Sequence, residues 1–193
     1  MRGLGIAIAM TLCLVAPCAL ADPQANSAIT IGGAGVGSEG EFWDHAEFHM
    51  GLRADVLFGR EETRDFGGGP YVEFGTFAFD ELSFGGGGSV LFPIHESLPL
   101  VASLGAYGRY GDDEFGLEPG ITGSIFWGTR SYNFHHNYVL AAGLLVGYRY
   151  TFGESRESAL VISAQLDLAL LGLPFVALIG LMRGPSSEAA PIE

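Results

Sequence analysis

The stretch EFHMGLRADVLFG, residues 47–59, alternates apolar residues with polar, charged or glycine residues. The apolar residues have even numbers: Phe48, Met50, Leu52, Ala54, Val56 and Phe58. The odd-numbered residues are Glu47, His49, Gly51, Arg53, Asp55 and Gly59, with Leu57 as the one apolar exception among them. A period of two indicates a β-strand, because successive side chains of a strand point to opposite faces. About ten alternating residues suffice to cross a bilayer as a tilted strand. The stretch therefore predicts a membrane-crossing strand.

Similar segments recur along the chain, separated by short connectors, several of which are rich in Gly, Asp, Asn and Ser. We expect eight strands, over residues 28–37, 46–59, 69–79, 82–92, 99–111, 115–130, 138–152 and 158–170. The facing of the first, glycine-rich strand stays open. An even number of strands joined by hairpins lets a sheet close on itself and leaves no free edge. The pattern predicts an all-β fold, a closed antiparallel eight-stranded up-and-down transmembrane β-barrel.

The first residues are typical of a secretory signal peptide. Arg2 is followed by an apolar stretch and by the small-residue cleavage site Ala19-Leu20-Ala21. We expect a signal peptide over residues 1–21, a barrel domain over 22–183 and a disordered tail over 184–193. A lipoprotein signal at Cys18 is the weaker alternative. Cys13 and Cys18 both lie in the signal, so no disulfide is expected.

One apolar stretch, residues 168–182, does not alternate. It is shorter than the roughly 20 residues that a transmembrane helix needs. We interpret it as the end of the eighth strand plus a short apolar tail. The alternative is a single-pass anchor on a soluble domain.

The charge composition narrows the range of partners. The chain has 9 basic and 22 acidic residues, a formal net charge of −13, and every base is arginine. Nucleic acid demands clustered positive charge, so it is excluded as a partner. A basic membrane-surface helix is excluded for the same reason. The 30 glycines lie among aromatic and aliphatic residues, which favours a tightly curved β protein over a flexible linker.

The predicted inward faces carry many ionisable side chains. An eight-stranded barrel is just wide enough inside for side chains to fill it, and buried charges must pair. We therefore predict a structural ion network in the lumen; a binding or conducting path is the alternative. Its expected members are Glu47, His49, Arg53, Asp55, Glu73, Arg109, Glu118, Arg149 and Asp167, with Gln165 beside them.

The sequence offers little catalytic chemistry. A Ser–His–acid site is possible in principle from His49, Glu47 or Asp55 and one of Ser89, Ser103 or Ser124, but nothing in the sequence brings them together. His135-His136 lacks a Cys or carboxylate at the spacing of a metal site. We expect no catalytic residues, no structural metal and no cofactor.

The connectors at one end of the predicted barrel are acidic. With the N-terminus in the periplasm, the outer connectors carry Glu39, Glu41, Asp44, Asp80, Glu81, Asp112, Asp113, Glu114, Glu154 and Glu157, against Arg156. A rim of this kind attracts divalent cations shared with anionic lipid head groups. Weak binding of Ca²⁺ or Mg²⁺ is a hypothesis from this pattern; a solubilising charged edge is the alternative.

Aromatic residues recur where the predicted strands end, as in the girdles of membrane barrels. They are Phe58, Tyr110, Trp127, Tyr148 and Tyr150. With the alternating segments and the inward Arg53, Arg109 and Arg149, they give the chain a resemblance to small eight-stranded outer-membrane β-barrels, the OmpA-like and OmpX-like group. The resemblance implies a location in the outer membrane of a Gram-negative-type cell. The short outer connectors and the non-aromatic C-terminal residue depart from that group.

The sequence thus predicts a bilayer-embedded outer-membrane protein with a structural or interfacial role, a plugged lumen and no open pore. It is not expected to be an enzyme. Two alternatives stay open. An outer-membrane lipid-modifying enzyme requires Ser, His and an acid to converge on the outer leaflet. A soluble periplasmic barrel for a small ligand requires the apolar faces to point inward and the arginines outward.

Overall fold

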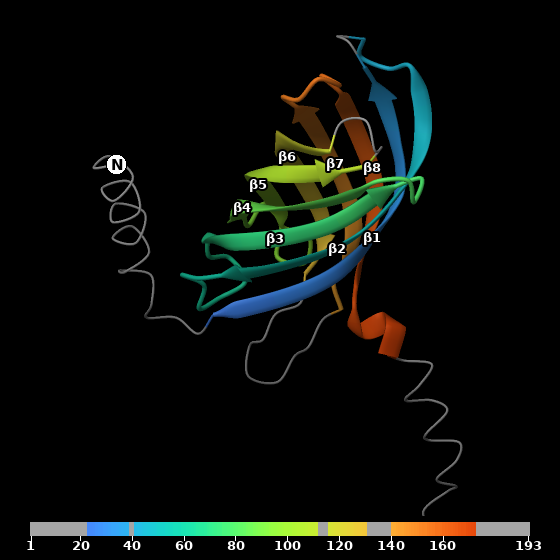
Figure 1. Cartoon of the computed structure of the whole chain (residues 1–193). Helices are drawn as coiled ribbons and strands as arrows, with labels where there is room; N and C mark the ends of the chain where they lie inside the picture. The colour runs from blue at the N-terminus through green and yellow to red at the C-terminus, as the bar shows by residue number, and fades with distance from the viewer. Residues whose placement is uncertain (1–22, 39–40, 112–115, 131–139, 173–193) are drawn as a thin grey trace, which may run out of the picture.

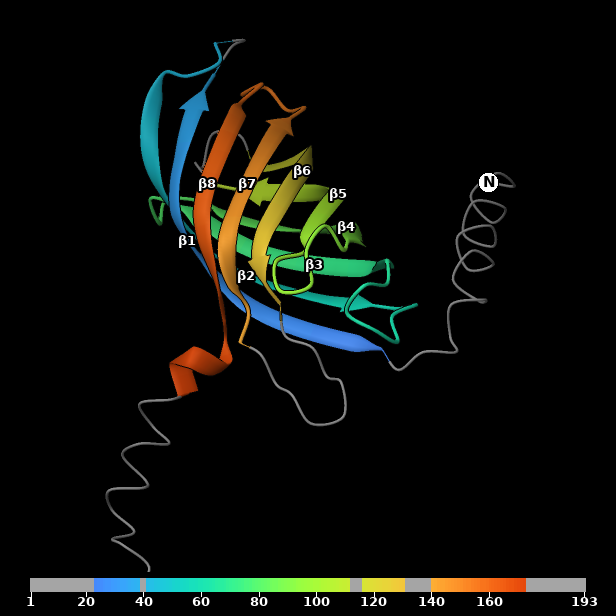
Figure 2. The same cartoon turned by 180° about the vertical axis from the view of Figure 1, so that it is seen from behind.

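The computed structural model describes residues 23–38, 41–111, 116–130 and 140–172, and the described chain forms a closed antiparallel barrel (Figures 1 and 2). Each strand pairs with its neighbour in sequence, and β1 also pairs with β8. The strands are β1 (Gln24–Gly37), β2 (His45–Leu57), β3 (Gly67–Phe77), β4 (Leu82–Phe92), β5 (Leu100–Tyr110), β6 (Leu117–Thr129), β7 (Ala142–Thr151) and β8 (Ser158–Asp167). The predicted fold class is confirmed.

The even strand number places the two ends of the sheet at one end of the barrel. β1 begins and β8 ends there, and we call this end the base (Figure 1). The other end, the mouth, holds the connections β1–β2, β3–β4, β5–β6 and β7–β8. The seam between β1 and β8 runs from the pair Ala28–Asp167 to the pair Gly37–Ser158. The cylinder therefore has no free edge along this seam, as ring closure requires.

The alternation of burial follows the sequence pattern. In β2 the side chains of His49, Arg53 and Asp55 are buried while Phe48 and Leu52 are exposed. Leu57, which breaks the sequence alternation, keeps the inward parity of its strand and is fully buried. In β1, the strand whose facing the sequence left open, Gln24, Asn26, Ala28 and Thr30 point inward.

The strand ends differ from the prediction. β1 begins four residues earlier than expected, at Gln24, and β7 begins at Ala142 rather than at residue 138. β8 ends at Asp167, where a turn leads into a short helix over residues 169–172. Asp167 accepts the N–H of Ala169 with 2.9 Å between N and Oδ1, which turns the chain out of the strand. In the described part of the chain, no helix is long and apolar enough to cross a membrane. Residues 173–183 lie outside the described ranges.

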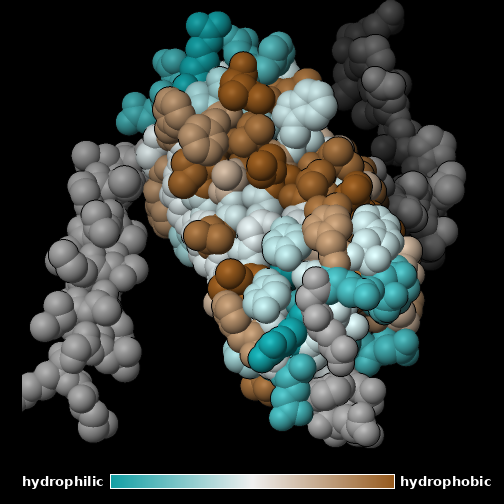
Figure 3. Space-filling view, turned by 90° about the horizontal axis from the view of Figure 1, so that it is seen from above, coloured by the Kyte–Doolittle hydropathy of each residue, from teal (hydrophilic) through white to brown (hydrophobic). Residues whose placement is uncertain are grey.

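The outer wall is apolar. Leu52, Val72, Leu104, Ile125 and Leu144 are each about half exposed or more, although they are aliphatic. In the space-filling view, hydrophobic side chains cover much of the described surface and hydrophilic ones gather toward its edges (Figure 3). Many exposed apolar side chains on the outside of a closed barrel are typical of a surface that contacts lipid.

Aromatic side chains lie at both ends of this wall. Toward the mouth are Phe48, Phe79, Tyr110, Tyr148, Tyr150 and Phe152, and toward the base are Phe58, Phe66, Phe92 and Trp127. The rings of Phe48 and Phe79 stack at 5.6 Å between centroids, and those of Phe66 and Phe92 meet edge-on at 5.9 Å. The five aromatic residues predicted at the two interfaces lie in these two bands.

The inner wall depends on glycines that make room for large side chains from other strands. A Cβ on Gly120 would lie 2.6 Å from the Tyr107 ring, and a Cβ on Gly105 would lie 2.5 Å from the Tyr71 hydroxyl. Tyr107 in turn donates to or accepts from Thr151, with 2.7 Å between the oxygens. Tyrosine side chains therefore fill the interior by packing against glycines, which leave room for them.

We expect Gly120→Ala to destabilise the barrel by about 1–3 kcal/mol, because its methyl group collides with the Tyr107 ring and with backbone. Gly88→Ala is the matched control, since a Cβ there meets nothing within 4 Å. Urea titration in lipid vesicles, followed by tryptophan fluorescence, measures both free energies of unfolding. Equal losses in the two variants would contradict this account of the inner wall.

Candidate functional site in the barrel lumen

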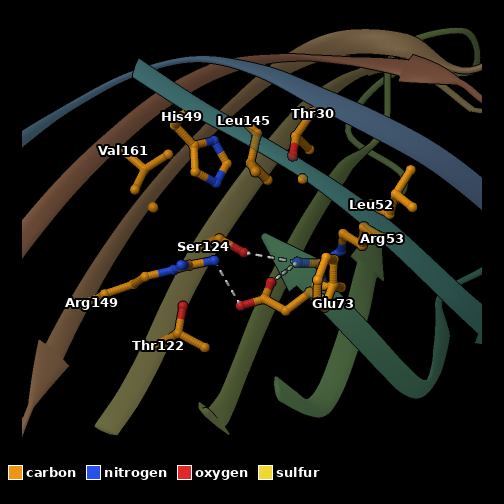
Figure 4. Close-up of a pocket in the computed structure, with 13 residues that line it drawn as sticks. Thr30, His49, Leu52, Arg53, Glu73, Thr122, Ser124, Leu145, Arg149 and Val161 are labelled. Carbon is orange, nitrogen blue, oxygen red and sulfur yellow. Dashed lines mark hydrogen bonds and ion pairs between the residues drawn. The ribbon is translucent and has the colours of Figure 1, made fainter. Parts of the chain in front are cut away.

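A chain of ion pairs crosses the middle of the lumen. Glu73 on β3 lies between Arg53 on β2 and Arg149 on β7 (Figure 4). Its Oε2 is 3.4 Å from Arg53 Nη1 and its Oε1 is 3.2 Å from Arg149 Nη2. One carboxylate thus bridges two guanidinium groups from different strands, which arginine suits because its planar fork carries five N–H donors.

Hydroxyl groups and rings satisfy the remaining arginine donors. Arg53 donates to Ser103 at 2.5 Å and, at longer distances, to Ser89 and Ser124, and its guanidinium lies 4.0 Å from the Tyr71 ring centroid. Arg149 donates to Ser83 at 3.0 Å and lies 5.4 Å from the ring centroids of Phe77 and Tyr107. Beside this network remains a cavity of about 20 Å³, enough for about one water molecule.

Two apolar clusters flank the central network. One, toward the mouth, consists of Ala34, Val36, Phe77, Ala159 and Val161. The other, toward the base, consists of Leu57, Leu91, Val101, Phe126 and Leu145. The cluster toward the base draws on β2, β4, β5, β6 and β7, and the cluster toward the mouth on β1, β3 and β8, so hydrocarbon occupies part of the lumen on both sides of the network.

The base holds a second, separate set of charges. Arg130, which follows β6, forms a buried ion pair with Asp55. Arg60 in the β2–β3 connection is also buried; it donates to Gln24 at 3.0 Å and to the carbonyl groups of Thr63 and Asp65. Two arginines therefore fix the base of the barrel.

The carboxylate of Asp65 also orders the β2–β3 connection at the base. The N–H groups of Glu62 and Glu61 donate to Asp65 Oδ2, at 2.8 and 3.0 Å. These hydrogen bonds lower the pKa of Asp65. Together with Arg60 they hold the connection against the barrel.

At the mouth, three carboxylates surround Arg109. Its Nη1 lies 3.0 Å from Glu81 Oε2 and also pairs with Glu157, and its Nη2 lies 3.1 Å from Glu118 Oε2. Glu118 accepts further hydrogen bonds from the N–H and hydroxyl of Ser155. One guanidinium therefore ties β5 to β6, to the β3–β4 turn and to the β7–β8 turn.

Three of the predicted network members lie outside these ion pairs. Glu47 accepts a hydrogen bond from His45 near the mouth, at 2.8 Å. His49 is buried, with its Nδ1 2.9 Å from Ser163 Oγ and its ring edge-on to Phe77. Asp167 accepts the backbone N–H groups of Ala141 and Ala169. The other six, Arg53, Asp55, Glu73, Arg109, Glu118 and Arg149, divide into the three sets above, while Gln165 is fully buried.

The sequence reasoning left Arg130 and Arg60 out of the ion network and assigned Glu81 and Glu157 to the acidic outer connectors. Arg130 already ends the predicted strand 115–130 on its inward parity. Extending the alternation by one residue before the strands that begin at Leu82 and Ser158 would have placed Glu81 and Glu157 inside. Arg60 is different, because Gly59 adopts a φ of +79° and shifts the parity at the end of β2.

The geometry brings together no catalytic triad among the described residues. Ser89, Ser103 and Ser124 surround Arg53, and the hydroxyl near His49 is that of Ser163, inside the barrel. In the same ranges no group of three or more His, Cys, Asp or Glu side chains is arranged to hold a metal ion. Glu81 and Glu157 turn toward Arg109, and Glu39, Asp112–Glu114 and His135-His136 lie outside the described ranges. The described acids of the cation hypothesis that remain, Glu41, Asp44, Asp80 and Glu154, are exposed and form no such group.

No family model matches the chain, and no curated protein matches it. Three solved structures of the attachment invasion locus protein Ail of Yersinia pestis are similar to it. The crystal structure has 14% identity and a TM-score of 0.41, covering 75% of this chain and 99% of Ail. The complex with the heparin analogue sucrose octasulfate has 16% identity and a TM-score of 0.41 over the same shares. The structure in a phospholipid bilayer nanodisc has 16% identity and a TM-score of 0.38, covering 75% and 100%. At such values the likeness carries no inference about ligands or activity.

We expect Glu73→Gln to destabilise the barrel by about 3–5 kcal/mol, because it leaves two buried guanidinium groups without their shared carboxylate. The control is Glu96→Gln, which removes an exposed pair with Arg64 and is expected to change stability by about 1 kcal/mol or less. Urea titrations of the two variants measure the difference. A loss for Glu73→Gln as small as the control's would show that the bridge does not hold the lumen together.

Proposed function

We propose that this chain is an outer-membrane β-barrel with a structural or interfacial role and a lumen closed to ions and solutes. The observation that carries the proposal is the filled interior: ion pairs, tyrosines and two apolar clusters leave a cavity of about 20 Å³ beside the central network. An aqueous channel needs a continuous hydrated path, which appears in much larger barrels.

The outward side chains support a location in a membrane. A closed barrel with aliphatic residues on its outer wall and aromatic residues at both ends matches the polarity profile of a bilayer. The same facing disfavours the soluble ligand-binding alternative, which would need Arg53, Arg109 and Arg149 outside. The lipid-modifying alternative lacks support as well, because the His49–Ser163 pair is buried in the lumen.

The acidic side chains at the mouth restrict the charge of the surfaces that this end of the barrel can contact. Glu41, Asp44, Asp80 and Glu154 are exposed there, and the exposed bases among the described mouth residues are Arg156 and His45. The net negative charge repels anionic partners and favours neutral or cationic ones. An interfacial role at this end would therefore involve such partners.

A polarity-sensitive dye tests the orientation of the wall. In a background with Cys13→Ser and Cys18→Ser, we expect a dye attached at Leu144→Cys or Ile125→Cys to report a hydrocarbon environment in vesicles. The same dye at Glu154→Cys or Glu96→Cys is expected to report water. Water-like emission at positions 144 and 125 would refute membrane embedding.

Single-channel recording tests the closed lumen independently. We expect no steady ion current from the wild-type protein in a planar bilayer. Arg53→Ala with Phe126→Ala removes a guanidinium and a ring from neighbouring layers of the filling and is expected to admit a measurable current. A steady wild-type current would overturn the proposal, while the embedding measured with the dye would stand.

A further inference from the structure

The β3–β4 turn at the mouth has a strained backbone. Ala78 and Phe79 have φ angles of +48° and +68°, and Asp80 N donates to Phe77 O at 3.0 Å, closing the turn. Positive φ at two central residues is the geometry for which Asn-Gly is favoured, since a Cβ crowds the backbone there. The chain instead places Ala and a bulky aromatic residue at these positions, so other contacts must hold the turn.

Four contacts hold it. The Ala78 N–H donates to the Phe48 carbonyl of β2 at 2.8 Å. The Phe79 ring stacks on Phe48 of β2. The Thr76 hydroxyl donates to the Glu81 carbonyl at 2.5 Å. The Glu81 carboxyl reaches inward to Arg109 Nη1 at 3.0 Å. The last contact joins the turn to β5, the strand that pairs with β4, and it is the contact whose charge can change.

The surroundings of Glu81 are unbalanced in charge. Glu157 of the β7–β8 turn shares Nη1 of Arg109 with it, and Glu118 of β6 takes Nη2. The charged groups that face Glu81 are Arg109 on β5, Arg149 on β7, Glu157, Glu118 and Glu47 on β2. When all are ionised, three carboxylates share the guanidinium of Arg109, and the like charges repel one another.

We propose that the turn 78–81 is a strained latch on the mouth of the barrel, closed when protonated Glu81 docks beside Arg109 and released when Glu81 loses its proton. The protonated carboxyl accepts a hydrogen bond from Arg109 without adding to the negative charge of Glu157 and Glu118. Once the proton leaves, repulsion adds to the backbone strain, and the turn moves out into water. Release uncovers Arg109 at the mouth and leaves the central network below it unchanged.

The direction of the pH dependence follows from the burial of Glu81. The pKa of Glu81 is raised to about 7 in the closed latch: desolvation by burial is the largest cause, Arg109 and Arg149 oppose the shift, and Glu157 and Glu47 contribute to it. A carboxyl whose pKa is higher in the closed state binds its proton more tightly there, so acid favours closure. The latch is then closed below about pH 7 and opens as the pH rises through that value.

A spin label on a single cysteine tests the latch. With Cys13→Ser and Cys18→Ser, Asp80→Cys puts the label on the exposed tip of the turn. We expect an immobile spectrum at pH 5.5, a mobile one at pH 8.5 and a midpoint near 7. A label at Ser97→Cys, exposed at the base, is the control and should not respond. A wild-type turn whose mobility does not change with pH overturns the proposal.

Two variants test separately the charge of Glu81 and the backbone strain of the turn. Glu81→Gln carries a permanently neutral side chain of the same shape, so the turn should stay immobile up to pH 8.5. An unaltered pH response in Glu81→Gln would show that another group drives the release. Ala78→Gly relieves the strain at that residue and keeps the Phe79–Phe48 stack, so a larger fraction of the turn should stay immobile at pH 8.5. A mobile fraction at pH 8.5 equal to that of the wild type would refute the role of strain. The measurement works in detergent micelles, so it is independent of lumen conductance.

Discussion

A closed cylinder of eight strands has an interior just wide enough for side chains to fill, and this limit governs what points inward. Each guanidinium that points inward must find carboxylates, hydroxyl groups or rings within the same narrow space. Arg53, Arg109 and Arg149 all do so, and no lysine occurs in the chain. The choice has a physical basis, because a planar fork can bond to several partners at once, while an ammonium offers a more compact and more strongly hydrated charge. The glycines of the inner wall complete the arrangement by making room for the tyrosines.

The facing of the strands was predictable because it depends on a local property. Alternation with a period of two separates lumen from wall one residue at a time, and it correctly put Arg53 inside and Leu52 outside. It also explains Leu57, whose inward apolar side chain belongs to the cluster that fills the lumen toward the base.

Contacts across the lumen were not predictable, because they depend on the register of eight strands together. Glu73 meets Arg149, 76 residues away in the sequence, and His49 meets Ser163 rather than one of the serines singled out beforehand. The strand ends escaped prediction for a different reason. There, single residues with positive φ, such as Gly59 and Phe79, decide where the next side chain points. In the mouth cluster, Arg109 and Glu118 follow the strand alternation, while Glu81 and Glu157 lie next to turns that contain such residues, Phe79 and Arg156.

The seam between β1 and β8 has a consequence for biogenesis. Seven of the eight strand pairings join neighbours in sequence and can form as soon as a hairpin is made, whereas the last joins Gln24–Gly37 to Ser158–Asp167. Until its final strand docks, a nascent chain therefore has two unpaired strand edges, and the guanidinium groups between them stay hydrated. Water therefore leaves the interior in the same step in which β8 pairs with β1. A chaperone that shields the first strand until the last one docks would protect the chain during the interval in which it is most prone to aggregate.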